Sequence, residues 1–421
     1  MHVDPIHARR LLFGEPVVHG IHLVLWALDA WVAQHGPRRL TRVAATFRKP
    51  LFVGHEVEVE LGPRLVARAG DAAVMELSLE SADGAHSDPP LEDHPFQRAA
   101  AHELTWPELA NAVGDTPLAR DRSLLAALFP ALVPHPHVQV CELLAATRIV
   151  GMACPGLHSI FSRLDLAASP RAEERVTYRV QKAVEKYSIV QVAFTGPTLA
   201  GALDTFVRPR PVTIELAPGR VPIDLFRDHR ALVIGGSRGL GEAFAKVLAA
   251  GGAQVHLTYR DGVVDAERVA TQIGGTASRY DVLGGVLELP WTPTRVYYFA
   301  TPKIRIARDE PFSPDDLRLL LDYYVLGLER TVRQVGACEV YAPSTVFLDG
   351  AERGTAAYTI AKAAMEELGR RLPELYPVTV SMPRLPRTAT DQTASLIAIP
   401  CADPIEIALT QLVGGSPGPL P

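Results

Sequence analysis

The chain is poor in cysteine and has neither a long apolar run nor a strong excess of one charge. Its four cysteines form no Cys-x-x-Cys pair, which argues against a disulfide framework or a structural zinc site. No uninterrupted apolar stretch reaches the roughly 18 residues that a membrane span needs, and the start lacks the regions of a signal peptide. With 42 Lys and Arg against 47 Asp and Glu, the net charge of -5 provides no surface for nucleic acid. We expect a cytoplasmic protein without a metal site.

The length and composition indicate a globular protein with more than one domain. Hydrophobic residues make up 48% and charged residues 21% of the chain, as is usual for globular proteins. The length of 421 residues exceeds what one hydrophobic core usually holds. A Pro218-Gly219 turn and the segment 221–228 precede a short, strongly apolar strand. We predict the main boundary there, with domains over residues 1–217 and 228–421.

The amino-terminal half repeats one pattern twice. A helix is predicted over 21–34, and strands follow over 41–48, 55–61 and 72–80. A second helix is predicted over 139–152, followed by strands over 160–166, 175–184, 188–194 and 199–207. A long helix followed by antiparallel strands, given twice, predicts two similar α+β layers side by side.

The carboxy-terminal half alternates strands and helices. Strands are predicted over 231–236, 254–260, 295–300 and 338–343, and helices over 242–252, 265–274, 315–335 and 358–372. This alternation is typical of βαβ units and a parallel, doubly wound sheet. Such a sheet places a ligand crevice at the carboxyl ends of its strands.

A glycine-rich loop and a tyrosine-lysine pair point to chemistry in this half. Residues 234–241, Ile-Gly-Gly-Ser-Arg-Gly-Leu-Gly, lie between a strand and a helix, where glycines let the backbone approach a pyrophosphate. A tight turn without a ligand is the alternative. Tyr358 and Lys362 lie four residues apart and share a helix face. The Lys362 charge favours a lowered pKa of Tyr358, which suits a proton donor to a carbonyl that receives hydride.

With these motifs, residues from about 228 onward resemble a short-chain dehydrogenase/reductase. The resemblance implies a Rossmann-like fold in which Tyr358 and Lys362 are catalytic. A hydroxyl before them holds the substrate oxygen: the family's spacing falls on Thr345 and its residue type on Ser344, so both are candidates. The implied cofactor-binding residues are Gly235, Ser237, Arg238, Gly239, Leu240, Gly241, Arg260, Asp281, Val282 and Ala300.

Charge at the end of the second strand indicates NADP(H) as the cofactor. A 2′-phosphate attracts cations, whereas a ribose diol prefers a carboxylate. Arg260 and Arg238 therefore favour NADPH, and Asp261 opposes it. Two features depart from the family: residues 298–301 replace its Asn-Asn-Ala-Gly, and Tyr324 stands where it has a proton-relaying asparagine. No final strand of the kind beside the family's dimer interface is predicted.

The opening run resembles MaoC-like dehydratases and (R)-specific enoyl-thioester hydratases, which have the hotdog fold. Residues 5–7, Pro-Ile-His, and 14–20, Gly-Glu-Pro-Val-Val-His-Gly, match their signature, and residues 46–55 resemble the start of the next strands. The resemblance implies that His7 is a base. It also implies that the helix entry at His19 and Gly20 binds the thioester oxygen through the Gly20 amide.

The acidic partner of His7 is the open question in this half. His2 stands at the position of the family's aspartate, so either Asp4 supplies the carboxylate or the site is inactive. A metal cluster of the nearby histidines is not expected, because their spacing fits metal ligation only loosely.

The predicted architecture is thus an α+β double hotdog followed by an α/β Rossmann-like doubly wound parallel sheet. The first hypothesis for the function is NADPH-dependent reduction of a 3-oxoacyl thioester, carried on coenzyme A or an acyl carrier protein. Dehydration of the 3-hydroxyacyl product to a 2-enoyl thioester follows. The alternatives are a reductase whose hotdog half binds acyl groups or dimerises, and a scaffold with no active site. We expect a homo-oligomer, and NADPH favours a role in fatty-acid or polyketide biosynthesis.

Overall fold

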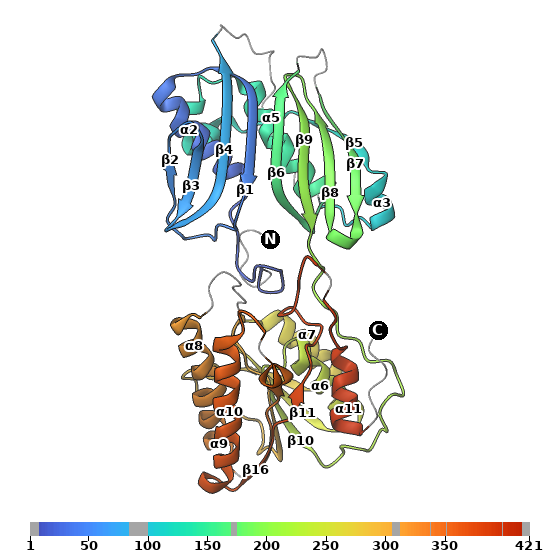
Figure 1. Cartoon of the computed structure of the whole chain (residues 1–421). Coiled ribbons are helices and arrows are strands. Elements are labelled where there is room, and N and C mark those ends of the chain that lie inside the picture. Colours follow the sequence, from blue (N-terminus) through green and yellow to red (C-terminus); the bar gives the residue numbers. More distant parts are fainter. Residues whose placement is uncertain are drawn as a thin grey trace. The chain divides into compact units, whose positions relative to one another are not determined.

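The computed structural model describes residues 8–83, 100–169, 175–304, 312–336, 338–350, 352–397 and 399–414 (Figure 1). The chain forms two compact units, which we name the amino-terminal unit (residues 1–210 with 395–398) and the carboxy-terminal unit (residues 211–394 with 399–421). The segment 211–227, around the predicted boundary, belongs to the carboxy-terminal unit. Its residues Ile214, Val221 and Phe226 are buried in the core of that unit.

The described part of the amino-terminal unit contains a nine-stranded sheet in the order β2-β3-β4-β1-β6-β9-β8-β7-β5. Two central strands, β1 (Arg39–Phe47) and β6 (Ser159–Ala168), pair antiparallel. The other strands are β2 (Glu58–Glu60), β3 (Leu65–Ala69), β4 (Ala72–Ala82), β5 (Val113–Pro117), β7 (Arg175–Val184), β8 (Ile189–Thr195) and β9 (Leu199–Val207). Outward from the centre, the order β4-β3-β2 on one side mirrors β9-β8-β7 on the other. The layout of one helix and four strands therefore occurs twice.

Two long helices and one face of this sheet share a single core. They are α2 (Gly20–His35) and α5 (His137–Arg148), and a π-helical turn over Ile149–Ala153 continues α5. The strands alternate as expected for a sheet with one covered face: Val190, Val192 and Phe194 of β8 are buried, and the residues between them are partly exposed. The short helices α3 (Trp106–Ala110) and α4 (Arg122–Leu128) lie in the connection between the two halves.

The described part of the carboxy-terminal unit contains a six-stranded sheet in which every neighbouring pair is parallel. Its order is β12-β11-β10-β13-β14-β16, which is 3-2-1-4-5-6 along the chain and is typical of a doubly wound fold. The strands are β10 (Arg230–Ile234), β11 (Gln254–Tyr259), β12 (Thr276–Arg279), β13 (Arg295–Tyr298), β14 (Cys338–Tyr341) and β16 (Val378–Ser381). The predicted parallel, doubly wound sheet is present.

Helices cover both faces of this sheet, and β10 shows why. Its residues Ala231 and Val233 point into one apolar cluster with α6 (Gly239–Ala250), α7 (Val263–Ile273) and α11 (Pro404–Val413). Leu232 and Ile234 point into a second cluster on the other face, with α9 (Gly327–Val335) and α10 (Ala356–Leu375). Both faces of the strand are therefore apolar, as in buried parallel sheets.

Two parts of this unit depart from the sequence prediction. The single helix expected over 315–335 is α8 (Pro314–Leu321), a π-helical turn η4 (Asp322–Leu326) and α9. The short strands β15 (Ser344–Thr345) and β17 (Arg384–Leu385) pair with each other in a separate parallel ladder. Within the described ranges, no helix combines the length and apolarity needed to cross a bilayer.

Candidate functional site

The glycine loop of the carboxy-terminal unit connects β10 to α6 at the carboxyl edge of the parallel sheet. Gly235 and Gly239 have φ angles of 76° and 60°, in the left-handed region that favours glycine. The first amides of a helix have no acceptor within the helix, and its dipole adds positive potential there. The loop therefore offers backbone N–H groups to an anion at the edge where doubly wound folds bind ligands.

The backbone packs closely where the loop meets the start of α6, and we name residues 235–241 the glycine cradle. A Cβ at Gly241 would lie 2.4 Å from the Gly235 carbonyl oxygen, and a Cβ at Gly235 would lie 3.0 Å from the Ala300 amide nitrogen. A side chain at either position would therefore clash with backbone atoms. Ser237 lies in the loop itself and Leu240 in the first turn of the helix. The backbone amides at the start of α6 are suited as donors to the pyrophosphate of a dinucleotide.

A later segment of the chain lies against this loop. Arg238 is the N-cap residue of α6, and its guanidinium lies 3.5 Å from a carboxylate oxygen of Asp391, which is buried. The methyl group of Thr390 would be 3.4 Å from a Cβ at Gly239. A carboxylate thus lies beside the predicted anion position, and the predicted cofactor ligand Arg238 is paired with it.

The second predicted cation, Arg260, directly follows β11. Its Nε donates to Asp261 at 2.7 Å, and it also donates to the hydroxyl of Tyr323 in η4. Asp261 therefore neutralises part of the charge that a 2′-phosphate would meet. After β12, Asp281 accepts from a backbone amide two residues on, and Val282 is buried.

Tyr358 lies in the first turn of α10 and the two candidate hydroxyls lie in β15. Burial raises the pKa of Tyr358, and a hydrogen bond with the Thr345 hydroxyl acts in the opposite direction. The Ser344 hydroxyl is buried and makes no hydrogen bond to another described residue. It acts on Glu366, whose pKa is lowered first by Arg384 and also by Ser344. Of the two candidate hydroxyls, only that of Thr345 acts on the pKa of Tyr358. The lowered pKa predicted for Tyr358 is not found, because burial disfavours the phenolate.

Lys362 lies one helical turn beyond Tyr358 and is buried. Its Nζ donates to the Pro343 carbonyl oxygen at 2.8 Å and to the Met365 sulfur at 3.4 Å. The same Nζ lies 4.1 Å from the centroid of the Tyr324 ring. Burial lowers the pKa of Lys362 to about 7, so the ammonium and the amine are both populated at neutral pH.

Tyr324, at the position of the family's asparagine, connects these residues. Its ring meets the Tyr358 ring edge-on with centroids 6.0 Å apart. Its hydroxyl is 2.7 Å from Thr301 Oγ1, and Thr301 donates to the Pro302 carbonyl oxygen at 3.1 Å. Tyr324 therefore donates to Thr301, which is consistent with burial raising the Tyr324 pKa well above its usual value.

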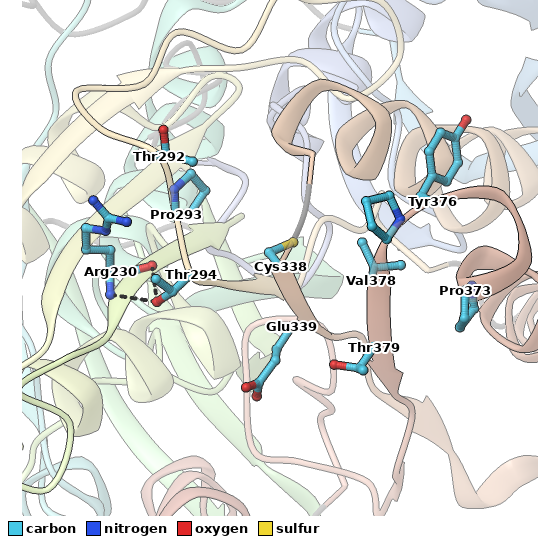
Figure 2. A pocket seen from close by; sticks show the side chains of 11 residues that line it. Arg230, Thr292, Pro293, Thr294, Cys338, Glu339, Pro373, Tyr376, Val378 and Thr379 are labelled. Atoms are coloured by element: carbon cyan, nitrogen blue, oxygen red, sulfur yellow. Dashed lines mark hydrogen bonds between the residues drawn. The ribbon is translucent and has the colours of Figure 1, made fainter.

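Two pockets occur at opposite edges of the parallel sheet. A small pocket at the carboxyl edge is lined by Tyr358 together with Lys303, Asp316 and Leu320. The pocket in Figure 2 lies at the amino edge, where Arg230, Cys338 and Val378 begin their strands. Ligands of doubly wound folds bind at the carboxyl edge, so the pocket that Tyr358 lines is the candidate site. In the described residues, no three His, Cys, Asp or Glu side chains gather as metal ligands.

In the amino-terminal unit, the structure brings together the two segments that resemble hotdog dehydratases. Val17 pairs with Phe52, and the Val18 amide donates to the Leu51 carbonyl oxygen at 2.8 Å. His19 caps α2 and Gly20 is its first residue; a Cβ at Gly20 would lie 2.7 Å from the Phe47 ring. Asp4 and His7 lie outside the described residues.

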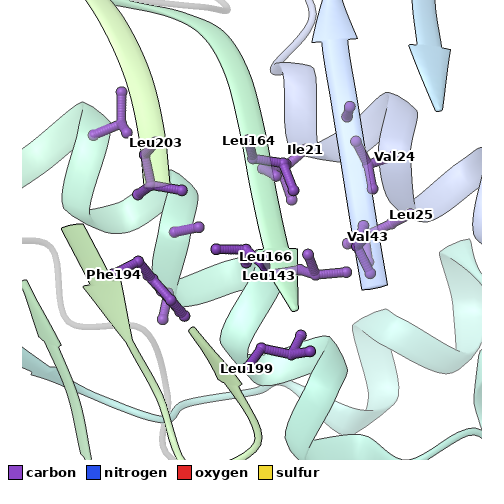
Figure 3. Packing of buried hydrophobic residues seen from close by; sticks show 14 of the residues in the cluster. Ile21, Val24, Leu25, Val43, Leu143, Leu164, Leu166, Phe194, Leu199 and Leu203 are labelled. Carbon is purple, nitrogen blue, oxygen red and sulfur yellow. The ribbon is translucent and has the colours of Figure 1, made fainter. Parts of the chain in front are cut away.

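The core beneath α2 fixes this helix start. Ile21 and Val24 of α2 pack in one cluster with Val43 of β1 and Leu164 of β6 (Figure 3). Because Ile21 follows Gly20 directly, the helix N-terminus is anchored to the centre of the sheet.

Sequence reasoning missed the segment around Asp391. The Lys303 ammonium donates to the Asp391 carbonyl oxygen at 3.0 Å, and the Gln392 side chain bonds the backbone of Pro302 and Ile304. These contacts join residues about 90 positions apart. A polar Thr-Asp-Gln run carries no periodic signal, so local pattern could not have found them.

Comparison with solved structures finds short-chain dehydrogenases among the chains that resemble this one. No protein-family model matches the chain, and no curated protein matches it. A short-chain dehydrogenase from Burkholderia cenocepacia J2315 in complex with NADP is 23% identical over 46% of this chain and 93% of its own, with a TM-score of 0.37. A candidate betaketoacyl-ACP reductase is 26% identical over 46% and 92%, with a TM-score of 0.38. A candidate short-chain dehydrogenase from Shigella flexneri in complex with NADP is 18% identical over 45% and 93%, with a TM-score of 0.40.

Proposed function

We propose that the carboxy-terminal unit is a short-chain dehydrogenase/reductase that uses NADPH to reduce a 3-oxoacyl thioester to the 3-hydroxyacyl thioester. One observation carries the proposal: the glycine cradle follows β10 and the Thr345–Tyr358 pair follows β14, and both strands end at the same edge of the sheet. A nucleotide-binding loop beside a proton donor is the arrangement that hydride reduction of a carbonyl requires.

In this reaction, Tyr358, Thr345 and Lys362 have different roles. Bound NADPH supplies the hydride that reduces the carbonyl carbon. Tyr358, kept neutral by burial, donates its proton to the carbonyl oxygen, which Thr345 orients. Lys362 in its charged form stabilises the phenolate that Tyr358 leaves behind.

The preference for NADPH rests on two cations. Arg260 and Arg238 both lie at the edge where the adenosine end of a dinucleotide binds. Their partners Asp261 and Asp391 reduce the available charge, so the preference over NADH is expected to be modest. The structural neighbours in complex with NADP are consistent with this assignment.

The reductase is tested by NADPH consumption with 3-oxoacyl thioesters of coenzyme A and of an acyl carrier protein. Tyr358→Phe is expected to lower the rate at least a hundredfold while NADPH binding persists, because only the proton donor is removed. Tyr376→Phe, at the other end of the same helix, is the matched control and keeps the rate. Equal rates in both variants would contradict the role of Tyr358.

For the amino-terminal unit we propose a double hotdog that dehydrates the 3-hydroxyacyl product to a 2-enoyl thioester. Two observations support this proposal. The arrangement of one helix and four strands occurs twice, and Gly20, the first residue of α2, packs against the Phe47 ring. First-turn amides of α2 are suited to hold the thioester oxygen. His7 would be the base, with Asp4 as the candidate carboxylate.

The dehydration is tested without nucleotide, by following enoyl absorbance from a 3-hydroxyacyl thioester. Conversion that His7→Ala abolishes supports the bifunctional enzyme. No conversion, or conversion unchanged in His7→Ala, favours the alternative of a reductase whose hotdog half binds acyl groups or dimerises. A homo-oligomer in the cytoplasm, with coenzyme A or an acyl carrier protein as the acyl carrier, belongs to the same proposal.

A further inference from the structure

We propose that Tyr324 is a positioning residue, whose ring holds the Lys362 ammonium in place for the proton donor Tyr358. The inference rests on the proposed reductase for its catalytic consequence. Tyr324 belongs to the π-helical turn η4, and Lys362 and Tyr358 belong to α10. The three side chains meet in the buried core between these two elements.

The contacts of Lys362 account for all three N–H groups of an ammonium. One is directed to the Pro343 carbonyl oxygen at 2.8 Å and one to the Met365 sulfur at 3.4 Å. The face of the Tyr324 ring, 4.1 Å from Nζ, is the third partner. Among the described residues, no carboxylate lies within 4 Å of the Lys362 ammonium, although the more distant Glu366 raises its pKa. The quadrupole of the Tyr324 ring adds a short-range attraction for the charge.

The hydroxyl of Tyr324 adds one hydrogen bond to the core packing that holds its ring. It donates to Thr301 Oγ1 at 2.7 Å, and Thr301 in turn donates to the backbone after β13. The ring is therefore held from the sheet side while its face remains turned to Lys362. The same ring contacts Tyr358 edge-on, so one side chain touches both the cation and the proton donor.

The groups that face Lys362 are few, which makes its titration interpretable. Tyr358 and Glu366 lie on its own helix, and Tyr324 lies on η4. Glu366 is bound by Arg384 of β17 through two hydrogen bonds of 2.8 Å. In the catalytic cycle, the charged form of Lys362 stabilises the phenolate, so reduction is expected to decline as pH rises through the Lys362 pKa.

The titration of Lys362 in the full chain tests the proposal without relying on catalysis. The chain has only six lysines, so with ¹³C-lysine labelling the Lys362 signal is assigned by its loss in Lys362→Met. Tyr324→Phe keeps the ring and removes the hydroxyl, whereas Tyr324→Leu and Tyr324→Met remove the ring. We expect a midpoint near 7 in the parent and in Tyr324→Phe, and a midpoint about one pH unit lower in the other two variants.

The rate profile provides the second readout. The pH at which NADPH-dependent reduction declines is expected to fall by the same interval in Tyr324→Leu and to stay in place in Tyr324→Phe. Tyr324→Met carries the comparison if Tyr324→Leu fails to fold. An identical Lys362 midpoint in all variants overturns the proposal even if the chain is an active reductase, and an equal fall in Tyr324→Phe overturns the role of the ring. If the parent shows no reduction but the Lys362 midpoint still falls in Tyr324→Leu and Tyr324→Met, the proposed function is refuted. The positioning of Lys362 by the Tyr324 ring is then supported all the same.

Discussion

Burial of Lys362 should make the stability of the carboxy-terminal unit rise with pH, and Lys362→Met should remove that rise. The Nζ is enclosed by Pro343, Met365 and Tyr324, and burial lowers the pKa of Lys362 from 10.5 to about 7. Between these two values the unfolded chain binds a proton that the folded chain does not. The free energy of unfolding therefore increases with pH across this window, by about 1.4 kcal/mol for each pH unit.

The magnitude follows from the interval that is measured. From pH 7.5 to pH 9.0, the parent is expected to gain about 2 kcal/mol relative to Lys362→Met. Methionine keeps the length of the side chain and loses the proton, so the difference between the two proteins isolates Lys362. Below pH 7 both states of the parent hold the proton, and the difference becomes constant.

Amide hydrogen exchange in the full chain measures this change where it occurs. Exchange of peptides from α10 at both pH values gives the free energy of opening of this unit, after correction for intrinsic exchange. Lys182→Met, at an exposed position of β7, controls for the loss of a lysine as such. A parent-minus-variant difference that is equal at pH 7.5 and pH 9.0 would refute the reasoning, because it would show that Lys362 keeps its proton in the fold.

Three further predictions concern the cofactor cradle and the choice of hydroxyl. Gly241→Ala should abolish NADPH binding measured by nucleotide fluorescence and lower the melting temperature, because its Cβ would meet the Gly235 oxygen at 2.4 Å. Asp391→Asn should tighten NADPH binding roughly fivefold in a calorimetric titration, since it removes a carboxylate beside the anion position at a gain of about 1 kcal/mol. Thr345→Ala should slow reduction at least tenfold and Ser344→Ala should keep it near the parental rate, because only Thr345 bonds Tyr358.

The architecture of the carboxy-terminal unit could be predicted because its signals are local. Alternating strands and helices define βαβ units, and the handedness and short connections of such units leave few sheet orders to consider. The strands β12 and β16 were missed, because four residues are too few for a strand pattern to be distinguished from the neighbouring chain. The interruption of the predicted helix 315–335 by η4 could not be predicted either, since its apolar spacing is that of an ordinary helix.

In the candidate site too, the sequence predicts the local features and misses the contacts between distant segments. Tyr358 and Lys362 could be found from their spacing on one helix, and the cradle from its glycines. The direction of the Tyr358 pKa could not, because it depends on burial by residues that are distant in sequence. The pairing of Arg238 with Asp391 is also a contact between distant segments, and it changes how much charge the cofactor would meet.

Transfer of deuterium from NADPH labelled at C4 to a 3-oxoacyl thioester tests the proposed reductase most directly. We expect the full chain to place deuterium on C3 of a 3-hydroxyacyl product identified by mass spectrometry, and Tyr358→Phe to do so at no more than about one hundredth of that rate. Product without deuterium, or equal labelling by the parent and Tyr358→Phe, would contradict the proposed reductase.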